Sequence, residues 1–175
     1  WGEQMDLQEP LTCDWMDINQ VLHEALTFMS ADLFFKHHVS TDIELQQGLP
    51  KVYGNSLAFK HAFGVLLENA VDGMRNSSEG HLAVRTAAEG NVKVAIRSNG
   101  NSWSEEPGNS NNGSVASNFS GTESQRCLHF HSRLDLNLVH RILKAYGGTL
   151  HQENQPGQTV STVSLPIRPE STVHT

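Results

Sequence analysis

The chain has 175 residues and a formal net charge of −7, with 12 Lys and Arg residues against 19 Asp and Glu residues. The basic residues are few and do not cluster, which argues against a nucleic-acid-binding surface. No apolar run reaches the roughly 20 residues needed to cross a bilayer, and no signal peptide opens the chain. We therefore expect a cytoplasmic segment without nucleic-acid or membrane partners, in which Cys13 and Cys127 are reduced thiols.

The first part of the chain predicts one helix and one strand. Residues 1–16 have apolar side chains without a period, and we interpret them as a linker or lead-in strand. Asp17 begins a capping-box pattern, and apolar residues then recur at helical spacing over Ile18–Leu33, which predicts a single helix. The alternating run Val39–Leu45 predicts a strand with one buried face, followed by a short extended piece at Val52–Tyr53.

The longest helical pattern is GNSLAFKHAFGVLLENAVDGM, from Gly54 to Met74. Its apolar residues form one broad stripe, as expected of a helix packed on the core. Asn69 lies at the edge of that stripe, and its simplest explanation is an amide bonded to a nearby backbone group.

A change in composition divides the rest of the chain. Leu82–Thr86 and Val92–Arg97 predict a β-hairpin. Most residues of Ser98–Ser124 are Ser, Asn or Gly, so this stretch buries too little surface to order itself, and we expect a long flexible loop or flap. An interdomain linker is the alternative, although the remaining chain is too short to form a second domain.

The C-terminal part predicts a helix and a second hairpin. A capping-box pattern begins a helix over Ser132–Tyr146, and Gly147–Gly148 ends it. Thr149–Glu153 and Thr159–Leu165 then form a pair of strands, followed by a loose tail over 168–175. The whole order predicts an α+β fold. We expect a two-layer α/β sandwich with a mixed, mostly antiparallel sheet and three helices on one face.

This order of elements resembles the ATP-binding domain of sensor histidine kinases. The run LLENA is similar to that family's N-box, VKVAIRSNG to the strand that enters its G1 box, and LVHRILKAYGGTLHQENQPGQTVSTVSLPI to its closing helix and strands. The resemblance implies the GHKL fold, shared with gyrase B and MutL, over residues 17–167, with a flexible ATP lid over 98–131. It also implies a role in two-component signalling, with ATP and Mg as cofactors.

The resemblance implies three nucleotide-binding positions. Asn69 matches the helical asparagine that helps to hold the Mg²⁺ accompanying ATP, and Gly100 matches a glycine of the family's Asp-x-Gly-x-Gly box. Ser98 stands where that box has the aspartate that accepts a hydrogen bond from the adenine amino group. A hydroxyl accepts this bond more weakly than a carboxylate, a loss of ~2 kcal/mol or roughly thirtyfold in affinity. No catalytic residue is implied here, because the family's phosphoacceptor His lies on a separate domain.

Two further motifs depart from the family. Arg133 and Asp135 stand at glycine positions of its G2 box, and the Asp135 carboxylate places negative charge where phosphates would bind a helix N-terminus. Val65 replaces a usually polar residue of the N-box, and Asp72 a residue that is often cationic. We therefore expect nucleotide binding to be weak or absent.

Two functions stay open. We favour a degenerate pseudokinase module that docks a dimerisation and phosphoacceptor domain, a response regulator or a true kinase. The alternative is a genuine Mg-ATP-binding catalytic domain that supports phosphoryl transfer to a His on a separate domain. A gyrase-type ATPase is disfavoured because no glutamate lies one turn before Asn69. A bare divalent ion near Asn69, Glu68 and Asp72 is a minor alternative.

Overall fold

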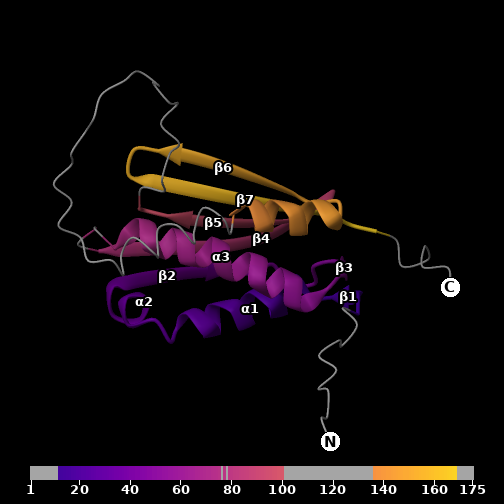
Figure 1. Cartoon of the computed structure of the whole chain (residues 1–175), viewed down its shortest axis with the longest axis horizontal. Coiled ribbons are helices and arrows are strands. Elements are labelled where there is room, and N and C mark those ends of the chain that lie inside the picture. Colours follow the sequence, from indigo (N-terminus) through magenta and orange to yellow (C-terminus); the bar gives the residue numbers. More distant parts are fainter. Residues whose placement is uncertain (1–11, 76, 78, 101–135, 169–175) are drawn as a thin grey trace, which may run out of the picture.

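The computed structural model describes residues 12–75, 77, 79–100 and 136–168. A five-stranded sheet in the order β2-β4-β5-β7-β6 forms one layer, and the helices pack on one of its faces (Figure 1). The strands β2 and β4 are parallel, and the other neighbours are antiparallel. This confirms the predicted two-layer α+β fold. The strands of this sheet are β2 (Val39–Glu44), β4 (Gly80–Glu89), β5 (Asn91–Ser98), β6 (Thr149–Gln155) and β7 (Gln158–Pro166).

The described part of the chain contains four helices. Three are α1 (Ile18–Met29), α2 (Leu33–His38) and α3 (Ser56–Met74), and the fourth covers residues 136–145. Side-chain oxygens cap the first three, because Asp17, Asp32 and Asn55 accept hydrogen bonds from backbone N–H groups at distances of 2.8, 2.9 and 2.8 Å. None of the described helices is long and apolar enough to span a membrane.

The single helix predicted over Ile18–Leu33 is wrong. The chain turns after Met29, and Asp32 then caps the separate helix α2 by accepting the Phe35 N–H. Asp32 favours this break because its side chain competes with helix continuation. Phe35 is buried in the core in place of Leu33, which is 71% exposed.

The strand predicted at Val39–Leu45 is present as β2, but it lies at an edge of the sheet. Ile43, expected on a buried face, is 45% exposed. Its cross-strand partner Val84 in β4 is fully buried. An edge strand is covered on one side only, which explains the difference.

A second, two-stranded sheet joins the N-terminal residues to the body of the domain. The strands β1 (Asp14–Met16) and β3 (Val52–Gly54) pair antiparallel, and the rings of Trp15 and Tyr53 meet edge to face at 5.5 Å. The Cys13 thiol lies 3.8 Å from the Tyr146 hydroxyl.

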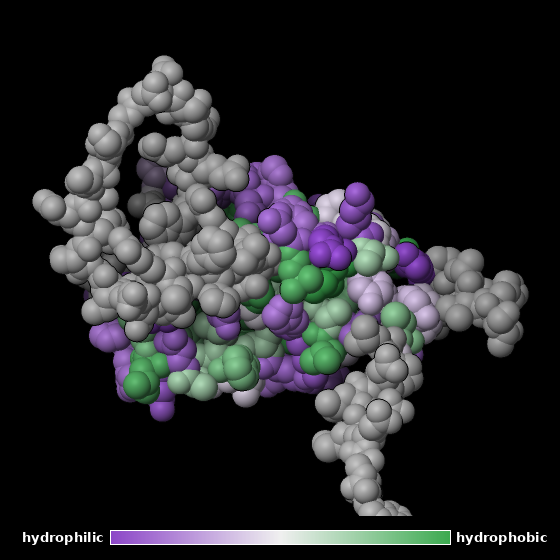
Figure 2. Space-filling model, in the orientation of Figure 1, coloured by the Kyte–Doolittle hydropathy of each residue, from purple (hydrophilic) through white to green (hydrophobic). Residues whose placement is uncertain are grey.

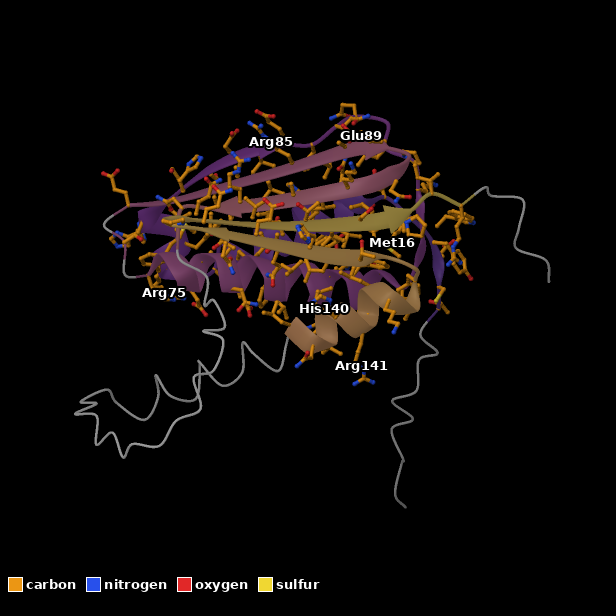
Figure 3. All side chains as sticks on the ribbon, turned by 90° about the horizontal axis from the view of Figure 1, so that it is seen from above. Met16, Arg75, Arg85, Glu89, His140 and Arg141 are labelled. Carbon is orange, nitrogen blue, oxygen red and sulfur yellow. The ribbon has the colours of Figure 1, made fainter. Side chains whose placement is uncertain are left out.

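The predicted helix Gly54–Met74 is confirmed as α3, the centre of the core. Phe59, Phe63 and Leu67 are fully buried in it. The sheet contributes alternate residues of β4, β5 and β7 to the same core, and the opposite face of the sheet carries polar side chains, among them Arg85 and Glu89 (Figure 3). Both predicted hairpins are also confirmed, with longer strands than expected.

Candidate functional site

The three residues assigned to the nucleotide come from α3 and the end of β5. Asn69 lies one turn before Gly73 in α3, Ser98 is the last residue of β5, and Gly100 follows it. A Cβ atom built on Gly100 would lie 2.4 Å from the Gly73 carbonyl carbon and 2.7 Å from the Met74 nitrogen. The end of β5 therefore meets α3 backbone to backbone, one turn from Asn69.

This contact gives Gly100 a structural role. The residue is buried, and its carbonyl oxygen accepts a 3.1 Å hydrogen bond from the buried Thr159 hydroxyl in β7. No other residue fits against the α3 backbone at that distance, because every other side chain begins with a Cβ. The retained glycine is therefore explained by packing, whether or not nucleotide binds.

Asn99, between Ser98 and Gly100, was missed by the sequence analysis. Its Oδ1 accepts the His81 N–H at 2.7 Å, and its Nδ2 donates to the Glu79 carbonyl at 3.0 Å. The amide thus ties the end of β5 to the start of β4. An isolated Asn in a polar stretch gives no sequence signal for such a role.

Ser98 is only 2% exposed and alternates with Ile96 and Val94 along β5, so it faces the helix layer. An ionised carboxylate at such a position would be costly without charge partners or several hydrogen-bond donors. A hydroxyl avoids that cost. Ser98 therefore fits the buried contact of β5 with α3 without needing such partners.

Asn69 has a polar atom without a partner. Its Nδ2 is buried and makes no hydrogen bond within the part of the chain that the structure describes. An unsatisfied buried donor costs about 1–3 kcal/mol, and an amide can also supply an oxygen ligand to a cation. The position fits Mg²⁺ as one ligand among several, since Mg²⁺ commonly keeps several waters and binds substrate phosphates.

The acidic neighbour Asp72 does not complete a metal site. Its Oδ1 accepts a 2.7 Å hydrogen bond from Arg75 Nε, and Arg75 Nη2 lies 2.7 Å from Asp32 Oδ2. The same guanidinium stacks over the Phe34 ring, 5.2 Å from its centroid. Within the described ranges no three His, Cys, Asp or Glu residues are placed to hold a metal, so the bare divalent ion gains no support.

The Arg75 cluster makes stability depend on pH. Burial disfavours the charged form of Asp32, but the Phe35 N–H and the Arg75 guanidinium outweigh this and lower the pKa of its carboxyl. Its stabilising contribution is present above the unfolded pKa of about 3.9 and is lost as the pH falls through the lower folded value.

We expect Asp32→Asn, which keeps the helix cap, to remove this part of the loss of stability in acid, as measured by urea titrations at several pH values. Parallel curves for the two proteins below pH ~4 would contradict this.

A hollow of about 330 Å³ lies on the outer face of the sheet rather than between α3 and β5. Ala83 and Ala95 line it together with Arg85 and Arg97, and it reaches Ser98 at the end of β5. Of the three predicted nucleotide residues it therefore includes only Ser98, and neither Asn69 nor Gly100. The assignments to the lid beyond Gly100 and to Arg133 and Asp135 lie outside the described residues.

Residues 54–169 match the family described as "Histidine kinase-, DNA gyrase B-, and HSP90-like ATPase", and the chain belongs to this family. The resemblance to a histidine-kinase ATP-binding domain is thereby confirmed. No curated protein sequence is similar enough to the chain to count as a match.

Solved histidine kinases share the fold. The catalytic domain of ThkA is similar with a TM-score of 0.66 and 18% identity, over 91% of this chain and 98% of that one. The mycobacterial sensor kinase MprB has a TM-score of 0.64 and 19% identity, over 89% and 99% of the two chains. AdeS of Acinetobacter baumannii has a TM-score of 0.62 and 20% identity, over 93% of this chain and 71% of that one.

Proposed function

We propose that this chain is a cytoplasmic histidine-kinase-like ATP-binding domain of two-component signalling that works as a degenerate pseudokinase module. It acts through contacts with a dimerisation and phosphoacceptor domain or with a response regulator. The observation that carries the proposal is Ser98, a buried neutral hydroxyl at the position of the family's adenine-binding carboxylate.

The neighbouring residues support this proposal. Gly100 is required by its contact with Gly73, and Val65 is buried in the core. The carboxylate of Asp72 is neutralised by Arg75. The packing frame is thus intact, while the adenine-binding carboxylate is replaced and Asn69 remains as one metal ligand without its usual family neighbours.

One observation favours genuine Mg-ATP binding as a second candidate function. The Nδ2 of Asn69 has no hydrogen-bond partner in the described part of the chain, so the donor end of this amide is not used to hold the fold together. When bound, Mg²⁺ would neutralise phosphate charge during transfer to a His on a separate domain. Asn69 would be its ligand from this chain, and Ser98 would accept the adenine hydrogen bond.

Calorimetric titration with ADP and ATP, with and without magnesium, tests the proposal. Because loss of the carboxylate costs roughly thirtyfold in affinity and further contacts are replaced, we expect no saturation up to millimolar nucleotide. The variant Ser98→Asp is titrated beside the wild type, because it restores the carboxylate and leaves Asn69 and Gly100 unchanged. Magnesium-dependent saturation of the wild type in the micromolar range would overturn the pseudokinase proposal.

A further inference from the structure

Some of the positive charges of the described residues are paired and others are not. Lys60, Arg75, Arg85 and Lys93 each form an ion pair with a carboxylate. Arg141, Lys144 and Arg168, at the C-terminal end of the domain, form none with any described residue. We call these three residues the C-terminal basic stripe.

The stripe is built on the helix over residues 136–145. Arg141 and Lys144 are three residues apart and exposed, so they lie on one side of the helix, while Val139 and Leu143 are buried on the other. Figure 3 shows Arg141 pointing away from the sheet, with the neighbouring His140 on the same helix.

Arg168 extends the stripe beyond the helix end. Its Nη2 donates a 3.4 Å hydrogen bond to the Tyr146 carbonyl oxygen, which holds its charge next to the last turn. Leu138 is 37% exposed one turn before Arg141. In the space-filling view, hydrophilic residues gather over this helix beside a small apolar area (Figure 2). The stripe thus combines three exposed cations with one exposed apolar side chain.

A solvated helix face is the simpler explanation for a single cation, and the helix dipole also stabilises Lys144 near the C-terminus. Neither explanation accounts for three unpaired cations at one end of a chain with a net charge of −7. The other unpaired Lys and Arg residues of the described part, Lys36, Lys51 and Arg97, lie on separate elements. A local positive field on an acidic protein attracts an acidic partner and steers its approach.

We propose that the C-terminal basic stripe docks an acidic helical segment of a partner protein, with carboxylates one helical turn apart and an apolar residue against Leu138. This rests on the proposed function only in that the domain acts through protein contacts, and it requires no nucleotide. The carboxylates pair with Arg141 and Lys144, and Arg168 sets the end of the contact.

The probe is a fluorescein-labelled helical peptide built from repeats of Glu-Ala-Ala-Leu-Glu-Ala-Ala, compared with the same peptide carrying Gln for Glu. We expect fluorescence anisotropy to show binding of the Glu peptide to the full chain at ~50 mM salt, weakening as salt rises, and none of the Gln peptide. Two exposed ion pairs predict that Arg141→Gln with Lys144→Gln weakens binding about tenfold.

Lys36→Gln with Arg97→Gln is the matched control, because it removes the same charge from α2 and β5. We expect it to change the affinity less than about twofold, since neither residue belongs to the proposed contact. Equal losses in the two double variants, or no binding of the Glu peptide, would overturn the proposal. Equally tight binding of a double-stranded DNA oligonucleotide would also overturn it, as a general polyanion site. A saturating ATP titration would contradict the pseudokinase without changing any of these results.

Discussion

Gly100→Ala is expected to lower the free energy of unfolding by about 3 kcal/mol or more, because the new methyl group has no space. Its Cβ would lie 2.4 Å from the Gly73 carbonyl carbon, 2.5 Å from the Gly73 oxygen and 2.7 Å from the Met74 nitrogen. All three atoms belong to the backbone of α3. No side-chain rotation relieves the contact, so β5 and α3 would have to move apart. Urea denaturation of the purified variant measures the change.

Gly64→Ala is the matched control for this prediction. Gly64 lies in the middle of the same helix, and a Cβ built on it has no neighbour within 4 Å. Alanine is the better helix former, so we expect this variant to gain about 0.5–1 kcal/mol. A destabilised Gly64→Ala together with a neutral Gly100→Ala would show that the packing of α3 on β5 is not as described.

The contrast between these two glycines shows what the sequence predicts and what it does not. Both follow ordinary helix or strand patterns, and nothing local distinguishes them. The role of Gly100 depends on Gly73, which is distant along the chain and meets it only after the sheet has formed. Motif comparison assigned Gly100 to nucleotide, whereas its observed contacts in the described residues are with α3 and Thr159.

The larger elements were predictable because their signals are local and strong. The apolar stripe of α3 has the helical period, and the two hairpins are bounded by turn residues, with Gly90 and Gly157 at positive φ. The split between α1 and α2 was not predictable from periodicity, since Leu33 continues the α1 spacing. The break is stabilised by Asp32, which caps α2 and accepts a hydrogen bond from Arg75, the C-cap residue of α3.

The hydrogen bonding of Asn69 was not predictable from the sequence. For an ordinary core helix the pattern indicates an amide bonded to nearby backbone, whereas the family resemblance implies a ligand of Mg²⁺. The structure instead leaves Nδ2 buried without a partner in the described ranges. A neighbouring amide, that of Asn99, is bonded at both of its polar ends. Substituting each of these two residues distinguishes an amide that stabilises the fold from one that does not.

Asn69→Leu is expected to raise the free energy of unfolding by about 1 kcal/mol, because it removes an unsatisfied buried donor and adds apolar contact with the core. Asn99→Leu is expected to lower it by about 1 kcal/mol, because the His81 N–H and the Glu79 carbonyl lose their partner. Urea denaturation without nucleotide gives both values. A loss in Asn69→Leu as large as that in Asn99→Leu would show that the Asn69 amide is bonded after all.

The same variant then decides between the two functions when it is titrated with Mg-ATP. If replacing Asn69 stabilises the fold, the asparagine either serves a ligand or is the remnant of a former ligand site. If wild-type heats are present and disappear in Asn69→Leu, while the variant is more stable than the wild type, the amide serves a nucleotide-bound metal. If neither protein gives heat, the gain in stability identifies Asn69 as a remnant, which is the outcome expected for a pseudokinase.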